Sequence, residues 1–284
     1  MISNIIRNFN MKEEDINVGP VGPYLEFKST TPMTITPNYT NSGVTLQYSL
    51  DKVTWTNITA KTVTPSAKVI YFRGSATGTK SLYTSSSSGN AWLFAGANNL
   101  EVNGDITMLL QDTLGGKVVD IPLASYCYSS MFYGCTRLTT APTLPATTLA
   151  DSCYSSMFYG CTGLTTAPEL PATTLATGCY QNMFYSCTSL TTAPTLPATT
   201  LANNCYQNMF YSCTSLNTAP TLPATKLADY CYSYTFNGCT SLTTAPTLPA
   251  TTLTGGCYQN MFYSCTSLTT APTLPATKIG RAHV

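Results

Sequence analysis

The stretch that decides the fold runs from Cys127 to Lys278 and contains one 26-residue unit almost six times, beginning CYSSMFYGCTRLTTAPTLPATTLADS. The sixth copy, which starts at Cys257, is shortened. A fixed period of this length is typical of a solenoid, in which each unit is one turn that buries its apolar face by stacking on its neighbours. We therefore predict a rod of six turns, about 29 Å long at about 4.8 Å per turn.

Within one unit, the residue pattern favours a short helix followed by a short strand. On a helical wheel of about 100° per residue, Cys127, Met131 and Cys135 fall on one apolar face, and the serines between them fall on the opposite face. The segment LTTAPTLPATTL that follows carries two prolines at the same places in all six copies. Because proline has no N–H to donate, we expect only three or four strand residues from about Leu138, and a second brief extended piece before Leu149.

The order C-x-x-L-x-x-A-P-x-L-P-x-x-x-L followed by M-F-x-x-C resembles the BspA-like leucine-rich repeat, and the resemblance covers more than half of the chain. The unit departs from that family in its length and in CYQNMF, Cys179 to Phe184, which replaces the shorter I-G-x-x-A-F. The resemblance implies a leucine-rich-repeat solenoid of short parallel strands and short helices. It also implies a bacterial surface protein with a role in adhesion, or a relative encoded by a phage.

The residues before the repeats indicate a second kind of structure. Short β-rich runs bounded by Pro, Gly, Asn and Ser predict a small antiparallel sandwich, and YSLDKVTW from Tyr48 resembles a hairpin of bacterial immunoglobulin-like modules. Trp92, Phe94 and Leu100 echo the spacing of the later repeats. The predicted organisation is a flexible arm (1–19), an immunoglobulin-like sandwich (20–90), a degenerate capping repeat (91–126), the repeats (127–278) and six residues that match a translated sequencing adapter (279–284).

Composition limits the partners that we expect. A net charge of +1 gives no argument for nucleic acid, and no apolar run approaches the roughly 20 residues of a membrane span. The N-terminal residues lack the apolar core of a secretory signal. The family resemblance nevertheless implies a cell-surface, extracellular or virion location. The oligomeric state is left open by the sequence.

All twelve cysteines lie in the repeats, with C-x₇-C spacing in each turn. Eight residues of helix span about 12 Å, which exceeds the roughly 7 Å limit for a disulfide. Equivalent cysteines of neighbouring turns would lie about 5 Å apart, but their Cβ atoms would point the same way. We expect free, buried thiols, with disulfides and a metal site as the alternatives; the spacing fits zinc poorly.

The sequence offers no set of catalytic residues. The single histidine, His283, lies in the adapter-like end, so no Ser-His or Cys-His pair is expected. The acids of the repeats, Asp151, Glu169 and Asp229, occupy different positions of the unit, and no glycine-rich phosphate loop is present. We predict a non-enzymatic protein without a cofactor or metal.

The best candidates for ligand contact are tyrosines on the polar side of the wheel. One occurs per turn except at Asn237, and they are Tyr133, Tyr159, Tyr185, Tyr211 and Tyr263. Stacked turns would align them in an exposed ridge that either binds a partner or only stiffens the rod. Positions that vary among the repeats add Tyr230, Tyr234, Arg137, Glu169 and Lys226.

These observations predict a binding or adhesion protein. Its partner would be a protein or glycan on a host or bacterial surface, and it could serve a phage as a receptor-binding or decoration protein. The alternative is a passive spacer that projects another domain. Neither nucleic acid nor membrane insertion is expected.

Overall fold

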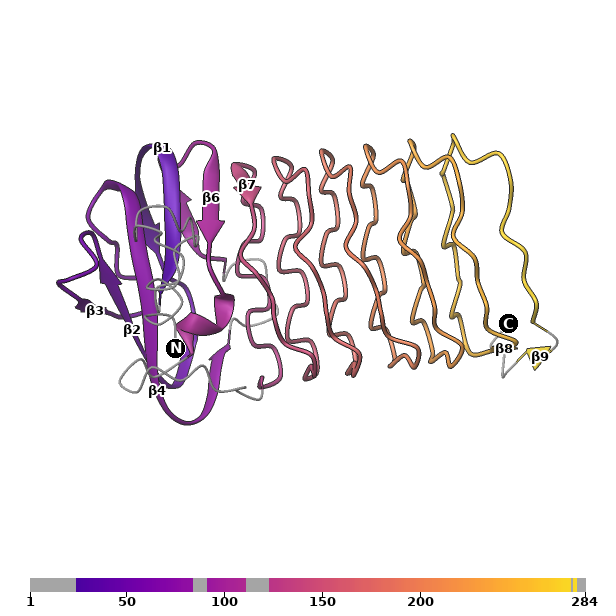
Figure 1. Ribbon diagram of the computed structural model, residues 1–284, viewed down its shortest axis with the longest axis horizontal. Coiled ribbons are helices and arrows are strands. Elements are labelled where there is room, and N and C mark those ends of the chain that lie inside the picture. Colours follow the sequence, from indigo (N-terminus) through magenta and orange to yellow (C-terminus); the bar gives the residue numbers. More distant parts are fainter. Residues whose placement is uncertain (1–23, 84–90, 111–122, 277, 280–284) are drawn as a thin grey trace, which may run out of the picture.

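The computed structural model describes residues 24–83, 91–110, 123–276 and 278–279. The arm at 1–19 lies outside these ranges, as do residues 280–284 of the adapter-like end. Figure 1 shows a β-sheet at one end of the molecule and a row of similar turns that extends from it to the other end. We call the described residues from 24 to 110 the N-terminal sheet and residues 123–276 the repeat stack.

The N-terminal sheet is antiparallel up to the point where it meets the repeat stack. Its strands are β1 (Leu25–Thr36), β2 (Thr40–Ser49), β3 (Thr56–Ile58), β4 (Ala67–Tyr83), β5 (Leu93–Ala95) and β6 (Leu100–Asn103), and the first repeat adds β7 (Leu138–Thr140). The order is β3-β2-β4-β1-β6-β7, with β5 paired to β1. The β6–β7 pair is parallel. One sheet therefore continues from the N-terminal residues into the first repeat.

The predicted two-sheet sandwich is not confirmed, because the described strands β1 to β6 all belong to one sheet. Alternation in β1 buries Leu25 and Phe27 on one face, as expected of a half-buried strand. That face packs on the repeats: the ring of Phe94 stacks on Phe27 at 5.7 Å and on Phe132 of the first repeat at 5.8 Å, between ring centroids. The repeat stack thus covers the face that a second sheet would have covered.

A short 3-10 helix, η3 (Ile106–Leu109), lies under β4. A Cβ atom added to Gly74 of β4 would lie 1.8 Å from the carbonyl oxygen of Leu109. Only glycine allows this approach of strand and helix. Asp105 caps η3 by accepting a hydrogen bond from the backbone N–H of Thr107.

The helix predicted at the start of each repeat is wrong; the structure has overlapping β-turns there. In residues 150–161, every second backbone N–H donates to the carbonyl three residues earlier, from Cys153 to Ala150 through Cys161 to Phe158. In every second turn, the third residue has a positive φ, which is the signature of a type II turn. These residues are Ser152, Ser156 and Gly160, with φ of 54°, 55° and 69°. Two turns advance the chain by four residues, so apolar residues recur with a period of four.

The other backbone N–H groups of this segment bond to the next turn of the repeat stack. Tyr154 donates to Cys179 and Phe158 to Met183, each at 3.0 Å, and equivalent bonds recur in later turns. All of these bonds run from one turn to the following turn. They satisfy the donors that the β-turns leave free.

The proline-containing segment forms very little strand, as predicted. Between β7 and the last described pair of strands, its pairings are single parallel bridges such as Thr166 to Thr192 and Thr148 to Thr174. A two-stranded parallel pair, β8 (Thr252–Leu253) and β9 (Lys278–Ile279), ends the described chain.

Equivalent side chains form buried columns through the repeat stack. The tyrosine rings from Tyr128 to Tyr258 stack at 5.5–6.0 Å, and the phenylalanine rings from Phe132 to Phe262 at 5.5–5.7 Å. Eleven of the twelve cysteines are buried and Cys135 is partly buried, which confirms the burial predicted for them. The buried residues form one cluster from Leu25 to Cys265, so the N-terminal sheet and the repeat stack share a core.

Candidate ligand-contact surface

Four of the predicted tyrosines form a second, outer column on the surface of the repeat stack. The rings of Tyr133, Tyr159, Tyr185 and Tyr211 are stacked with centroid separations of 4.4, 4.5 and 4.4 Å and interplanar angles of 4–7°. All four side chains are partly exposed. We call these four residues the outer tyrosine column.

Stacking determines what the outer tyrosine column can offer to a ligand. Rings 4.4 Å apart cover each other's faces, so the interior members present ring edges and hydroxyl groups to solvent. An edge and a phenol hydroxyl suit a ligand with hydrogen-bonding groups. A broad aromatic platform for stacking is not available in the middle of the column.

Neighbouring rings lie closer together in the outer tyrosine column than in the buried one. Equivalent rings are 4.4–4.5 Å apart in the outer column and 5.5–6.0 Å apart in the buried tyrosine column. The outer rings therefore form a continuous strip along the repeat stack. Stacked repeats commonly bind partners along such extended surfaces.

The column ends where the fifth repeat departs from the others. Asn237 takes the place of the tyrosine and is 5% exposed, whereas Tyr263 in the next turn is 66% exposed. Tyr263 is therefore separated from Tyr211 by one turn. The structure aligns four of the five predicted tyrosines and leaves the fifth apart.

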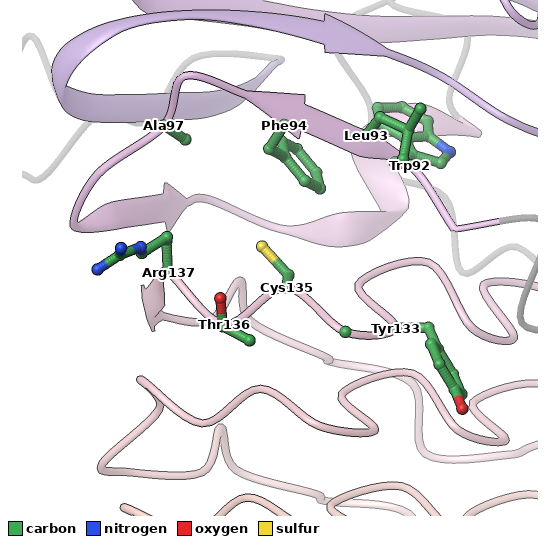
Figure 2. A pocket seen from close by; sticks show the side chains of 9 residues that line it. Trp92, Leu93, Phe94, Ala97, Tyr133, Cys135, Thr136 and Arg137 are labelled. Carbon is green, nitrogen blue, oxygen red and sulfur yellow. The ribbon is translucent and has the colours of Figure 1, made fainter.

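The other end of the column borders a pocket of about 170 Å³ between the N-terminal sheet and the first repeat, which we call the junction pocket. Figure 2 shows Tyr133 and Arg137, two predicted residues, at opposite ends of it, with Phe94 and Cys135 facing each other between them. The remaining lining residues are Trp92, Leu93, Ala97, Gly134 and Thr136.

The junction pocket exists because the first repeat has no complete turn in front of it. A Cβ atom added to Gly134 would meet nothing within 4 Å, whereas one added to Gly160 in the next turn would lie 3.7 Å from Gly134. Every later turn is thus covered by the turn before it at this position. The first turn is covered only by the strands around Phe94, and a gap remains.

Rows of amide side chains, which the sequence reasoning did not select, run along the same turn segment as the outer tyrosine column. Gln181 Nε2 donates to Gln207 Oε1 at 2.6 Å, and Asn208 Nδ2 donates to Asn182 Oδ1 at 2.9 Å. The sequence signal was the replacement of Ser-Ser by Gln-Asn at two adjacent variable positions of consecutive repeats. The phenylalanine of the junction pocket, Phe94, gave no comparable signal of function.

The remaining predicted residues do not join this surface through any described contact. The Glu169 carboxylate accepts a hydrogen bond from the Thr195 hydroxyl at 3.0 Å, and exposed Lys226 forms a backbone bridge with Thr200. Tyr230 is 39% exposed. Its ring lies against Gly256, so closely that a Cβ atom added to Gly256 would clash with the ring of Tyr230. Tyr234 is half-buried in the same repeat.

The surface holds no activated nucleophile at neutral pH. Burial raises the pKa of the Cys135 thiol in the junction pocket to about 11, so the reactive thiolate is scarce there. Burial and the neighbouring phenols raise the pKa of Tyr185 to about 12. Within the described residues, no three His, Cys, Asp or Glu side chains gather as a metal site would require.

Among the described residues, no helix has the length and apolarity to cross a membrane. Comparison with curated proteins and with solved structures gave no match. A family model, the BspA type leucine rich repeat region, matches residues 121–242 and 177–281 with six copies. Repeats of this family are non-enzymatic, binding-type modules. The match covers more than half of the 284 residues, and the chain therefore belongs to the BspA-type leucine-rich-repeat family.

Proposed function

We propose that the protein is a non-enzymatic binding protein whose repeat stack contacts a protein or glycan on a host or bacterial surface. The observation that carries the proposal is the outer tyrosine column, four aligned and partly exposed tyrosines along the surface of the repeat stack. Tyrosine combines a large contact area with a hydrogen-bonding group, which is why it is enriched where proteins meet partners.

The chemistry of the neighbouring residues supports a ligand rich in hydrogen-bonding groups. The outer tyrosine column presents hydroxyl groups, and the rows headed by Gln181 and Asn182 present amides. Arg137 at the junction pocket adds one positive charge at the start of the column. A ligand that lies along the turns with an acidic group at the end near Arg137 would match this distribution.

The family membership supports a location at the surface of a bacterial cell or of a virion, where adhesion is needed. In a phage, the protein would act in receptor binding or as a decoration protein. In either place, the partner would be met by the repeat stack and not by a catalytic centre.

We further propose that the N-terminal residues close the first end of the repeat stack. The parallel pairing of Leu100 with Leu138 and the stacking of Phe94 on Phe132 support this role. Terminal repeats of such proteins need a cap because an uncovered end exposes apolar residues.

The test replaces all four tyrosines of the outer column by serine and measures binding to a glycan array and to bacterial and host cells. The matched control replaces four exposed threonines of the proline-containing segment by serine: Thr173, Thr199, Thr225 and Thr251. Binding should be lost in the tyrosine variant and kept in the control. Far-ultraviolet circular dichroism checks that both variants stay folded.

The alternative function, a passive spacer, is favoured by one observation: the tyrosine rings pack on each other and so stiffen the stack. A spacer would bind no ligand through its surface. If neither wild type nor the tyrosine variant bound cells or glycans, the binding proposal would fail and the spacer would stand; equal binding by both would overturn the role of the outer tyrosine column.

A further inference from the structure

We propose that the outer tyrosine column is a modification site at which a one-electron oxidant, such as a heme peroxidase with hydrogen peroxide, joins neighbouring rings as dityrosine. The link would form between successive turns of one molecule. This inference concerns the column's reactivity and does not depend on the ligand-binding role proposed above.

The geometry brings the reacting atoms together before oxidation. Each neighbouring pair of rings in the outer column has its centroids 4.4–4.5 Å apart and its planes within 7° of parallel. Carbon atoms of neighbouring rings are then near the roughly 3.5–4.0 Å of van der Waals contact. Holding two reactants in contact removes most of the entropic cost of their meeting.

The reaction balances as two one-electron oxidations followed by coupling. Each phenol gives one electron to the peroxidase and releases its hydroxyl proton, which leaves a neutral phenoxyl radical with spin on the ring carbons beside the oxygen. Two such carbons form a C–C bond, and the hydrogen atom on each returns to the oxygen as a proton shift. One link therefore removes two hydrogen atoms in total, and the two electrons reduce one hydrogen peroxide to two waters.

The thiols, which are usually the first groups to be oxidised, are shielded in this protein. Eleven of the twelve cysteines are buried. Burial also raises the pKa of thiols such as Cys179 and Cys187 to about 12, which suppresses the thiolate. Cys135 is the least buried thiol beside the outer column, and its pKa is raised to about 11. Oxidation is thereby directed to the phenols on the surface.

The buried tyrosine column provides an internal comparison. Its rings are 5.5–6.0 Å apart, and Tyr154, Tyr180 and Tyr206 are at most 1% exposed. These rings lie within a packed core that opposes the rotation needed for a new bond. Links should therefore form in the outer column and not in the buried one, and they should stop at Asn237.

The experiment compares two double variants that each keep two phenols and all four rings of the outer column. Tyr159→Phe with Tyr211→Phe leaves Tyr133 and Tyr185, which are not neighbours. Tyr133→Phe with Tyr159→Phe leaves Tyr185 and Tyr211, which are neighbours at 4.4 Å. Both proteins are treated in dilute solution with a heme peroxidase and hydrogen peroxide, and the monomer fraction is isolated under denaturing conditions.

The measurements are dityrosine fluorescence and mass spectrometry of peptides from a protease that cuts beside aromatic residues. The neighbour-retaining variant should give one intramolecular link, with the loss of two hydrogens, between Tyr185 and Tyr211. The alternating variant should lose the intramolecular link. Equal yields in the two variants, links confined to other tyrosines, or no link in the wild-type monomer would each overturn the proposal.

Discussion

Single residues in the columns carry much of the stability of the repeat stack. Phe184 is fully buried and stacked between Phe158 and Phe210 at 5.6 and 5.7 Å. Replacement of Phe184 by alanine should lower the free energy of unfolding by about 3–5 kcal/mol. The substitution leaves a cavity, and the packed rings on either side of it cannot move to fill it. Urea denaturation measures the loss, and Phe262→Ala in the last turn is the matched control.

Phe262 is only half-buried, so its truncation should cost clearly less than that of Phe184. An equal loss in both variants would contradict the claim that packing between turns holds the stack together.

Buried acidic protons make the protein sensitive to alkaline solution. Burial raises the pKa of the Cys187 thiol to about 12 from an ordinary value of 9.0, and that of the Tyr180 hydroxyl well above 10.0. The unfolded chain therefore loses these protons at a lower pH than the folded chain, so the stabilisation is complete below about pH 9 and decreases from there through about pH 12. Each such group lowers the free energy of unfolding by up to about 1.4 kcal/mol per pH unit in this window.

Urea midpoints measured from pH 7 upward check this expectation, with a Cys187→Ala variant as the control that should show a shallower decline. A stability that stays constant to pH 11 would show that the buried thiols and phenols titrate freely in the folded protein.

Sequence reasoning identified the residues of the candidate surface better than it identified their arrangement. The regular spacing of the tyrosines from Tyr133 to Tyr211 was sufficient to predict that they align, because alignment follows from the repeat. The junction pocket was not predictable, because it depends on how Phe94 of the non-repeated residues meets the first turn. Arg137 was singled out by its variation, but no pattern placed it at the same pocket as Tyr133.

At the level of the element, the turn segment shows how a correct amphipathic pattern led to a wrong structure. Pairs of apolar residues every four positions fit a helix of 3.6 residues per turn over a short stretch. They fit the four-residue advance of the β-turns better over the whole segment. The signal that could have separated the two is the Gly, Ser or Asn at most of the fourth positions, where the structure has positive φ; Tyr230 and Tyr234 of the fifth repeat are exceptions.

Position 212 tests this account of the turns. Ser212 has a φ of 56°, and its equivalents Gly134, Gly160 and Gly238 also have positive φ. Ser212→Gly should leave stability unchanged or slightly raised, whereas Ser212→Val should lower the free energy of unfolding by about 1–2 kcal/mol, because a β-branched residue is strained in this region. Thermal and urea unfolding of the two variants give the comparison. Equal effects of Gly and Val would contradict the turn geometry.

At the level of the whole molecule, the N-terminal sheet and the repeat stack share one core. The prediction of β-strands before residue 91 is confirmed by β1 to β4, and these strands belong to one sheet whose buried residues share a core with the repeats. Sequence patterns within each part cannot show this, since alternation reveals that a face is buried and not what buries it.

The shared core and the strict period predict which deletions the molecule tolerates. Removing residues 179–204, one complete unit, brings equivalent residues together and should leave a folded protein with a single unfolding transition. Removing thirteen residues, 179–191, should misalign every following column and abolish cooperative unfolding. Circular dichroism during thermal unfolding distinguishes the two. If both deletions behaved alike, the columns would not be what determines the fold.

The hydrogen bonds between the β-turn segments of neighbouring repeats all run toward the following turn, and they give this side of the repeat stack a polarity. In the last described turn, the backbone N–H groups of Tyr258, Asn260 and Phe262 have no carbonyl partner among the described residues. A segment that pairs with this side of the turn must therefore offer carbonyl oxygens to these three donors, as each following turn offers them to the turn before it.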